Sequence, residues 1–578
     1  MLANLDDSYI PGYRLVADAV HRHGGLLFVQ LNHLGASTHG RGTERPLQAP
    51  SPLASYIHGE VPHELEVELI EDIVRAFGAA AERCQRAGVD GVLIHAAHGY
   101  LLNTFLSPLT NRRVDRYGGN ADKRMRMLME VLQAVRTAVG TEFPVGVRLS
   151  VDELVAGGLT LQDSLPIARR LDQSGLVDYL DVSCGVDYEH LSHGTHYPGM
   201  HLPLGTWTHL AAAVKAEVRV PVSCAGRIRD PEQAEALLAE GAVDLVQMAR
   251  ALLADPELPN KAREGRLDDI RPCLYISSGC LGRLYRGMPI SCVQSPAVGF
   301  ERQFAIVPSA EAVKRIVVVG GGPAGLEAAR VARLRGHDVV LFEREMTLGG
   351  QMRLAARAPG RAELLGGVSY LETQIAKLGV EVRRGVSASA ADILAERPDA
   401  VIVATGSSAA PLDIASATSI NVCSVRAVLD GSAETGTRVV VVDGLGRIAA
   451  SSVADHLASL GRQVWLVSRD YSIGANIDQT TRPIVERRLR EAGVGLISGA
   501  EVTAFEGSTV HLRDCFSDRR WTLEDIQTLV HDMGGRARDG LYHELIAAGV
   551  VAHRVGDCLA PRELEEAFHE GFRVAFSL

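Results

Sequence analysis

The sequence of 578 residues lacks the features that mark membrane, secreted and nucleic-acid-binding proteins. No segment approaches the roughly 18 apolar residues that cross a membrane, and the acidic start MLANLDDSY has no basic and apolar signal-peptide pattern. Lys and Arg number 59 against 70 Asp and Glu, so charge does not favour nucleic acid or anionic lipid as a partner. Nine cysteines, an odd number, are not typical of a disulfide framework. We expect a cytoplasmic protein of roughly three or four domains, with reduced thiols.

The first half of the chain alternates short apolar segments with helical stretches. Six strand-like segments occur at 26–31, 91–96, 143–149, 179–184, 220–226 and 243–249. Helical stretches lie near 11–24, 66–87, 121–139, 161–174, 207–217 and 231–240. This alternation predicts a parallel sheet with crossover helices. The long polar segments 32–64, 97–120 and 184–206 follow strands, as expected where a (β/α)8 barrel builds its site.

The segment GVLIHAAHGYLLNTFLSPLTNRRVDRYGG at 91–119 closely resembles the Old Yellow Enzyme family of FMN barrels. VQLNH (29–33), VGVRLS (145–150), AGR (225–227) and MARALLADPEL (248–258) extend the resemblance over the first half. It continues into a flavin domain, the layout of 2,4-dienoyl-CoA reductase and trimethylamine dehydrogenase. Those larger members carry FMN, a 4Fe-4S cluster and a second nucleotide-binding half.

The resemblance implies an α/β protein with a (β/α)8-type FMN barrel, N-terminally incomplete with six visible strands, followed by a two-dinucleotide-binding, Rossmann-like flavoprotein half. We expect a barrel at 1–270, a cysteine-rich junction at 271–310, an FAD- or ADP-binding domain at 311–420 and 546–578, and an inserted NAD(P)H-binding-like domain at 421–545. Full-length family members have two further strands before the helix at 11–24. Three explanations compete for the missing strands: a start codon placed too far downstream, a split enzyme whose partner supplies them, and a barrel that has lost FMN.

The resemblance also implies roles for individual barrel residues. Gln30 and Arg148 would meet the pyrimidine edge of FMN, where Arg148 places positive charge near N1. The phosphate would be bound at the ends of the last two strands by Gly226, Arg227, Ala249 and Arg250. His95 and His98 match the family pair that hydrogen-bonds a substrate carbonyl, and Tyr100 matches the proton donor.

Two groups of barrel residues have alternative interpretations. His190, His193 and His196 recur every third residue, which fits either a metal site or a polar loop that lines the substrate. Cys184 and Cys224 lie at strand ends and are interpreted as packed thiols rather than nucleophiles.

The second half opens with a dinucleotide fingerprint. RIVVVGGGPAGLEAARVARLRGHDVVLFER contains Gly320, Gly322 and Gly325 between a strand and a helix, and the next strand ends at Glu343. This pattern predicts a pyrophosphate at the helix N-terminus and Glu343 on the adenosine ribose. Gln351 in LGGQ and Asp557 in VGDC are further marks of the two-dinucleotide flavoprotein family, and Asp557 would meet the FAD ribityl chain.

A second nucleotide-type unit carries a degraded fingerprint. Gly444 and Gly446 are followed by Ala449, but Asp443 stands where the first glycine of the triplet belongs. No acid ends the next strand, and Arg469 would suit a 2'-phosphate. Two interpretations of this unit are open: it binds NAD(P)H, or it is retained only for structure.

Three cysteines lie at the junction, in RPCLYISSGCLGRLYRGMPISC. The family pattern Cys-x2-Cys-x3-Cys-x11-Cys falls on Cys273, Ile276, Cys280 and Cys292, so one iron ligand of an iron-sulfur cluster is replaced. Three alternatives follow from the isoleucine: an oxygen ligand such as Ser277 completes the cluster, a three-iron cluster forms, or no cluster binds.

The leading functional hypothesis is a flavin-dependent NAD(P)H oxidoreductase that reduces an activated C=C bond in an enone or enoyl thioester. The alternatives are an amine dehydrogenase or demethylase that passes electrons to an external acceptor, and a partial, non-catalytic subunit of a related flavoenzyme. We expect a small-molecule substrate, no nucleic acid or membrane partner, and a homo-oligomer or a hetero-oligomer with a related flavoprotein subunit.

Overall fold

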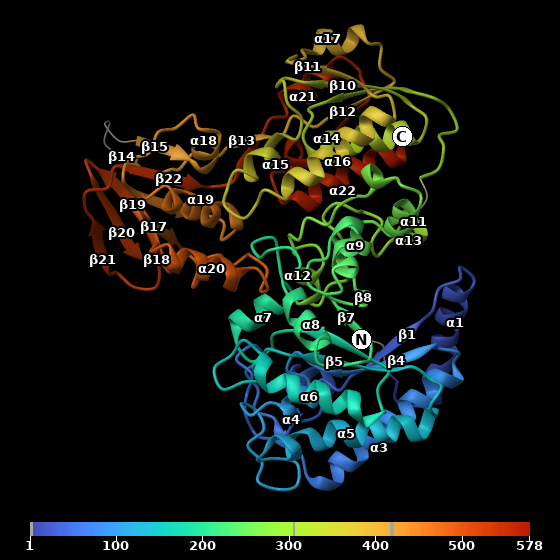
Figure 1. The fold of residues 1–578 in the computed structure, drawn as a ribbon. Helices are drawn as coiled ribbons and strands as arrows, with labels where there is room; N and C mark the ends of the chain where they lie inside the picture. The colour runs from blue at the N-terminus through green and yellow to red at the C-terminus, as the bar shows by residue number, and fades with distance from the viewer. Residues whose placement is uncertain (1–3, 305–306, 417–420) are drawn as a thin grey trace. The chain divides into compact units, whose positions relative to one another are not determined.

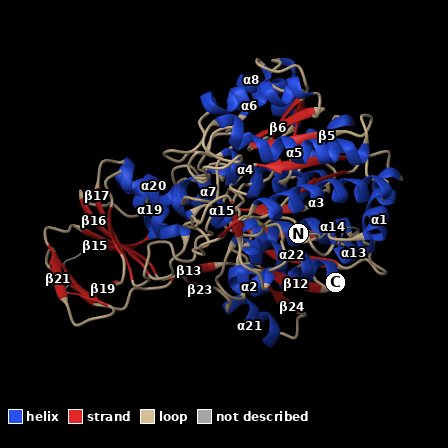
Figure 2. Cartoon of the chain, turned by 90° about the horizontal axis from the view of Figure 1, so that it is seen from below, coloured by secondary structure: helices blue, strands red, loops and turns tan. Residues whose placement is uncertain are grey.

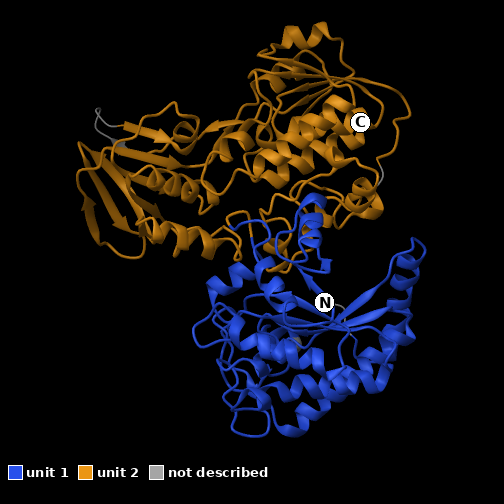
Figure 3. Cartoon of the chain, viewed as in Figure 1, with its two compact units in different colours: residues 1–198, 202–248 blue, residues 199–201, 249–578 orange. Residues whose placement is uncertain are grey.

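The computed structural model describes residues 4–304, 307–416 and 421–578. Its contacts divide the chain into two compact units, residues 1–198 with 202–248, and residues 199–201 with 249–578 (Figure 3). The predicted domain limits at 1 and 420, and residues 305–306 of the predicted junction, lie outside the described residues. The contact boundary after Met248 comes earlier than the predicted barrel limit of 270, and the four predicted domain ranges stay predictions.

The first unit is built on one six-stranded parallel sheet in the order β1-β4-β5-β6-β7-β8. Its strands are β1 (Phe28–Leu31), β4 (Gly91–Ala96), β5 (Val145–Ser150), β6 (Tyr179–Ser183), β7 (Val222–Cys224) and β8 (Leu245–Val246). Each overlaps one of the six predicted strand segments. Consecutive strands pair in parallel, for example Val92 with Val145 and Val147 with Leu180, so the carboxyl ends of all six meet at one edge.

Helices connect these strands, as the alternating pattern predicts (Figures 1 and 2). They are α1 (Ile10–His21), α3 (Val67–Arg86), α5 (Ala121–Val139), α6 (Leu161–Ser174), α8 (Thr208–Lys215) and α9 (Pro231–Ala239). Local sequence sets their ends: Thr160 and Asp163 form a capping box on α6, and Gly175 ends it with a φ of 66°. Buried β4 and β5 residues pack with α3 and α5 in one apolar core.

The predicted loops contain short elements that the sequence pattern does not show. These are α2 (Gly40–Thr43), β2 (Gln48–Ala49), β3 (His63–Glu64), α4 (Leu101–Leu106) and α7 (His190–His196), and a further short element, η1 (Asp7–Tyr9), precedes α1. Helices α4 and α7 follow strands β4 and β6, so both lie at the carboxyl edge of the sheet.

The six-stranded sheet is open within the described part of the chain, because β1 and β8 each pair with one neighbour. The edge strands carry exposed apolar side chains, Phe28 at 40% and Leu245 at 51% exposure. The prediction of an incomplete barrel with six strands is therefore confirmed.

The second unit contains a Rossmann-like sheet in the order β11-β10-β9-β12-β24, with every pair parallel. Its strands are β9 (Arg315–Val319), β10 (Asp338–Glu343), β11 (Glu381–Arg384), β12 (Ala400–Val403) and β24 (Ala552–Arg554). The associated helices are α14 (Pro323–Leu334), α15 (Gly350–Ala355), α16 (Leu364–Lys377), α17 (Ala390–Ala395), α21 (Gly540–Ala547), η3 (Gly556–Cys558) and α22 (Leu564–Ser577). Strand β24 returns late in the chain to pair with β12, so a long insertion separates two neighbours in this sheet.

The insertion holds a second parallel sheet, β15-β22-β16-β17-β18, and an adjoining sheet β14-β19-β20-β21. The strands of the first are β15 (Asn421–Ser424), β16 (Arg438–Asp443), β17 (Gln463–Ser468), β18 (Gly495–Ile497) and β22 (Thr528–Asp532). Those of the second are β14 (Ala415–Ser416), β19 (Ala500–Glu506), β20 (Thr509–Asp514) and β21 (Arg520–Leu523). Helices α18 (Val425–Asp430), α19 (Ile448–Ser459) and α20 (Arg482–Glu491) accompany them, and β13 (Ser407–Ala409) pairs with β23 (Gly535–Ala537).

Along the chain, short helices follow β8 and precede the first strand of the Rossmann-like sheet. They are α10 (Arg250–Ala254), α11 (Leu258–Arg263), η2 (Leu267–Asp269), α12 (Leu281–Leu284) and α13 (Glu301–Phe304). Among the described residues, none of the helices has both the length and the apolar character needed to span a bilayer.

Candidate active site and cofactor sites

The three predicted catalytic side chains lie together at the carboxyl end of β4. His95 is on the strand, His98 follows it with a φ of 64°, and Tyr100 is the N-cap residue of α4. The His95 ring centroid lies 5.0 Å from that of His98 and 4.9 Å from that of Tyr100. One short turn of chain therefore brings two imidazoles and a phenol to one place.

A buried hydrogen-bond network holds this turn. The His98 N–H donates to Ser150 Oγ at 2.9 Å, and its Nε2 lies 2.6 Å from Ser183 Oγ. The Gly99 N–H donates to Asn103 Oδ1 at 2.6 Å, and Asn103 Nδ2 donates to Glu153 Oε1 at 3.0 Å.

Glu153 is itself buried, and its other oxygen accepts from Ser107 Oγ at 2.6 Å and from the Leu159 N–H at 2.9 Å. Burial raises its pKa to about 7, although these hydrogen bonds oppose the shift. No sequence pattern predicts a role for Asn103 and Glu153, because only the fold shows that both side chains turn inward.

The protonation states of the trio follow from their burial. Desolvation lowers the pKa of both His95 and His98 well below the usual value, and the nearby charge of Arg148 adds to the effect. Desolvation raises the pKa of Tyr100, and neighbouring Tyr197 and Asp187 raise it further. The site thus offers two neutral imidazoles and a phenol that keeps its proton.

Helix α7 brings a second polar cluster to the same edge. His193 Nδ1 lies 2.7 Å from Asp187 Oδ1, and His196 Nδ1 lies 3.5 Å from the same oxygen. The His196 ring stacks on that of His98, with centroids 4.4 Å apart. Burial alone would raise the pKa of Asp187, but the His193 hydrogen bond and the charge of His196 outweigh it, so the pKa is lowered.

Donor atoms of Asp187, His193 and His196 all lie within 4.8 Å of one another, so this cluster could hold a metal ion. His190, the third histidine of the sequence pattern, is exposed. The structure therefore brings two of the three histidines together, and a metal site and a polar substrate loop both stay predictions.

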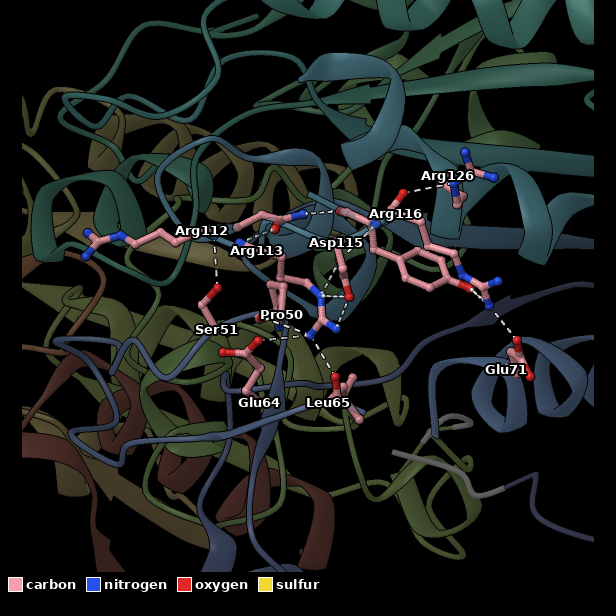
Figure 4. A network of polar contacts seen from close by, with 12 residues as sticks. Pro50, Ser51, Glu64, Leu65, Glu71, Arg112, Arg113, Asp115, Arg116 and Arg126 are labelled. Carbon is pink, nitrogen blue, oxygen red and sulfur yellow. Dashed lines mark hydrogen bonds and ion pairs between the residues drawn. The ribbon is translucent and has the colours of Figure 1, made fainter. Parts of the chain in front are cut away.

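A clamp around Arg113 fixes the chain that follows α4 (Figure 4). Arg113 Nη1 donates to the backbone oxygens of Leu65 at 2.7 Å and Pro50 at 3.3 Å, and Nη2 donates to Asp115 Oδ2 at 2.5 Å. Its side chain is only 5% exposed. The clamp therefore connects the segment that follows α4 to the segment that leads into α3.

The predicted flavin edge is assembled around Arg148 on β5. Arg148 forms an ion pair with buried Asp181, while its Nη1 donates to Gln30 Oε1 at 3.2 Å and its Nη2 donates to Gln247 Oε1 at 2.6 Å. The cation is thus held beside Gln30, as the prediction requires. Burial raises the pKa of Asp181, and Arg148 opposes that shift.

The predicted phosphate-binding residues divide between the two units. Gly226 has a φ of 126°, and a Cβ there would come within 2.7 Å of Trp207 Cδ1, so only glycine fits. Arg227 beside it is buried. Ala249 and Arg250 belong to the second unit. The shared phosphate site stays a prediction.

The two remaining barrel thiols match their interpretation as packed side chains. Cys184 and Cys224 are fully buried, and burial raises the pKa of both, to about 12 for Cys224. Neither is therefore a reactive thiolate near neutral pH.

The three junction cysteines line one pocket in the second unit with a cavity volume of about 30 Å³, and Ile276 lines it with them. Burial raises the pKa of Cys273 to about 12 and also raises those of Cys280 and Cys292. Arg250 lines the same pocket, with its guanidinium 4.6 Å from the Tyr275 ring centroid. All nine cysteines are free.

The first dinucleotide turn has the predicted geometry between β9 and α14. A Cβ at Gly320 would lie 2.3 Å from Ala404 O, and one at Gly325 would lie 1.9 Å from Gly320 O. Gly322 faces open space at the N-terminus of α14. The turn therefore leaves room for a pyrophosphate where helix N–H groups point outward.

The other residues predicted to bind FAD lie nearby. Glu343 Oε2 accepts from the Gly321 N–H at 2.6 Å, which fixes the carboxylate at the end of β10. Gln351 Nε2 donates to Asp557 Oδ2 at 2.9 Å, so these two side chains are neighbours.

The second dinucleotide turn, after β16, differs from the first. Asp443 Oδ1 accepts from the N–H groups of Leu445 at 3.1 Å and Gly446 at 2.7 Å. Burial raises the pKa of Asp443 to about 6. Arg469, which the sequence suggested for a 2'-phosphate, is exposed and 3.4 Å from Glu501.

Comparison with known proteins identifies the family. The model of the NADH:flavin oxidoreductase / NADH oxidase family matches residues 2–269, and that of the pyridine nucleotide-disulphide oxidoreductases matches residues 314–552. NADH oxidase from Thermoanaerobacter brockii is 39% identical to this chain, and the matched region covers 86% of this chain and 76% of the length of the oxidase. The chain belongs to the NADH:flavin oxidoreductase / NADH oxidase family.

Two further relatives of this NADH:flavin oxidoreductase span almost its whole length. N,N-dimethylglycine/sarcosine dehydrogenase from Chromohalobacter salexigens is 35% identical over 98% of this chain and 88% of its own. The structure of 2-naphthoyl-CoA reductase in complex with 2-naphthoyl-CoA superposes with a TM-score of 0.93, at 28% identity, over 100% of this chain and 89% of that one. The likeness therefore includes a reductase and an amine dehydrogenase.

The family assignment implies FMN in the barrel and FAD with NAD(P)H in the second unit. The barrel residues fit a flavin, since Arg148 is held beside Gln30 and His95 Nδ1 is buried with no hydrogen-bond partner among the described residues. The first dinucleotide turn fits FAD through the space at Gly322. The second turn fits a dinucleotide less well, because Asp443 occupies its N–H groups.

Proposed function

We propose that this NADH:flavin oxidoreductase reduces a C=C bond conjugated to a carbonyl group, in an enone or enoyl thioester. The observation that supports it most directly is the buried trio of neutral His95, neutral His98 and protonated Tyr100 at the end of β4. FMN, when bound, supplies the hydride for the β-carbon of the substrate.

Each member of the trio has a role in this reaction. His95 and His98 donate N–H hydrogen bonds to the carbonyl oxygen and stabilise the negative charge that develops there. Tyr100 gives its phenolic proton to the α-carbon and is reprotonated from solvent. Asn103 and Glu153 act on the turn that carries His98 and Tyr100, so they are positioning residues.

The experiment is a half-reaction with 2-cyclohexenone. Enzyme reduced anaerobically with one equivalent of NADH is mixed with the enone, and flavin absorbance and cyclohexanone are measured. We expect reoxidation at a rate that falls at least about 100-fold in Tyr100→Phe, in line with the usual contribution of a general acid. Reduction by NADH, which does not involve Tyr100, should be unchanged. No cyclohexanone, or equal reoxidation rates in the two proteins, would count against the proposal.

A second candidate is oxidation of a methylated amine. Asp187 favours it, because this buried carboxylate has a lowered pKa and lies beside imidazoles that stack on His98, where it could attract an ammonium group. The similarity to N,N-dimethylglycine/sarcosine dehydrogenase points the same way. Anaerobic bleaching of the flavin by N,N-dimethylglycine without nicotinamide would support this candidate, and no bleaching would exclude that substrate.

A further inference from the structure

The junction pocket collects groups that suit an iron-sulfur cluster but provides only three thiols. Cys273, Cys280 and Cys292 line it together, and most of its remaining wall is apolar. Arg250 adds a cation whose Nη1 is buried and has no hydrogen-bond partner in the described part of the chain. Thiolates, an apolar wall and a nearby cation are the surroundings that an anionic cluster requires.

The fourth position of the ligand pattern is occupied by Ile276, which also lines the pocket. Its side chain has no donor atom, so one corner of a cubane would lack a protein ligand at that residue. The next residue, Ser277, lines the pocket as well and is 4% exposed. Its Oγ makes no hydrogen bond to any described residue, although burying a hydroxyl without a partner costs about 1–3 kcal/mol.

The backbone around Ile276 is held in an unusual conformation. Tyr275 has a φ of 52° and Ser277 a φ of 68°, the left-handed region that residues other than glycine rarely adopt. The turn is secured by hydrogen bonds from the Met200 N–H to Tyr275 O and from the Gly282 N–H to Ser277 O. A strained, well-secured turn that presents an unsatisfied hydroxyl is typical of a ligand site.

We propose that this pocket holds a four-iron, four-sulfide cluster bound by the sulfur atoms of Cys273, Cys280 and Cys292 and by Ser277 Oγ. On binding, each thiol and the hydroxyl releases one proton and forms one bond to iron, so the ligand set carries four negative charges. Because an alkoxide is a harder ligand than a thiolate, the iron bound to Ser277 differs from the other three. Removing Ser277 Oγ should therefore release that one iron.

Two other buried oxygens in the pocket have no hydrogen-bond partner among the described residues, Ser291 Oγ and Gln294 Oε1. Ser291 adjoins Cys292, which already supplies a ligand, whereas Ser277 adjoins the residue that cannot. Ser277 is thus the better candidate, and Ser291 is the matched comparison. Ser278 lines a different pocket and provides a serine control outside the site.

The experiment uses the full chain, reconstituted anaerobically with ferrous iron and sulfide. Iron and acid-labile sulfide are measured per chain, and electron paramagnetic resonance spectra are recorded before and after dithionite reduction. We expect about four irons in the wild type, about three in Ser277→Ala with a three-iron signal in the oxidised state, and about four in Ile276→Cys, Ser291→Ala and Ser278→Ala. Unchanged FAD content and thermal melting would show that each variant is folded.

Several results would overturn the proposal. They are four irons in Ser277→Ala, loss of one iron in Ser291→Ala in place of Ser277→Ala, and a wild type that takes up three irons or none. These readouts do not involve the barrel substrate. They are therefore independent of whether the enzyme reduces enones.

Discussion

The carboxylate of Asp443 accepts a hydrogen bond from the N–H of Gly446 at 2.7 Å, within the turn where a dinucleotide pyrophosphate would be bound. In the first turn strand β9 ends at Val319 and is followed by Gly320, and the space at Gly322 is open. The second turn therefore uses its own side chain as the anion. A bound nucleotide must displace this carboxylate or bind with fewer backbone contacts.

Replacement of Asp443 should strengthen nicotinamide binding. Asp443→Gly frees the N–H groups of Leu445 and Gly446 and removes a buried charge, so we expect the dissociation constant for NADH to fall about tenfold, or about 1.4 kcal/mol. Asp443→Asn removes only the charge, so its dissociation constant for NADH should lie between those of the wild type and Asp443→Gly. In the wild type, affinity should increase as pH falls from 7.5 to 5.5, because the carboxyl with a pKa of about 6 becomes neutral. Anaerobic NADH titrations measure these dissociation constants. If the wild type and both variants gave the same value at every pH, Asp443 would not compete with the nucleotide.

Glu153 should make stability depend on pH. Its pKa is raised from 4.5 to about 7 in the folded state, so its contribution to stability is complete below pH 4.5 and is lost as pH rises to 7. The loss is on the order of 3 kcal/mol. In Glu153→Gln, urea unfolding free energies should vary less between pH 4.5 and 7. The exposed control Glu142→Gln should keep the wild-type slope, and a similar slope in Glu153→Gln would argue against a titrating Glu153.

Arg113 should be a major contributor to the stability of the first unit. Arg113→Ala removes its hydrogen bonds to Leu65 O and Pro50 O and leaves both acceptors to be satisfied by water, so we expect a loss of about 3 kcal/mol. The neighbouring Arg112 is exposed, and Arg112→Ala should change stability by less than about 0.5 kcal/mol. Thermal melting of both variants distinguishes them, and equal melting temperatures would show that the clamp contributes little.

Arg148 should control the potential of the barrel flavin. Arg148→Met removes the cation beside Gln30, and we expect a two-electron reduction potential lower by tens of millivolts, at about 30 mV for each 1.4 kcal/mol. Arg148→Lys keeps the charge and should retain most of the wild-type potential. Spectroelectrochemical titration of protein with a confirmed FMN content measures the shift. An unchanged potential in Arg148→Met would place the arginine away from the reduced ring.

Much of the fold was predictable because its signals are local. The six apolar segments of the first half and the Gly320 turn of the second are contiguous stretches whose period and glycine spacing define their structure. Helices α4 and α7, which lie in segments predicted as loops, are short and bury polar residues, so apolar periodicity does not reveal them. Their inward orientation follows from hydrogen bonds to Glu153, 50 residues away from Asn103 in the chain, and to Asp187, in the turn that precedes α7.

The sequence by itself determined the family, the parallel sheets, the proposed catalytic trio at 95–100 and the missing thiol at Ile276. Each is encoded in a short run of residues, whose spacing and side-chain chemistry are legible without the fold. Only the tertiary structure decided that Glu153 supports the turn at 95–100, that Asp443 occupies its own nucleotide turn and that Ser277 Oγ is buried without a hydrogen-bond partner among the described residues. Those properties depend on burial from solvent and on which groups come into contact in the folded chain. Neither can be deduced from the order of the residues alone.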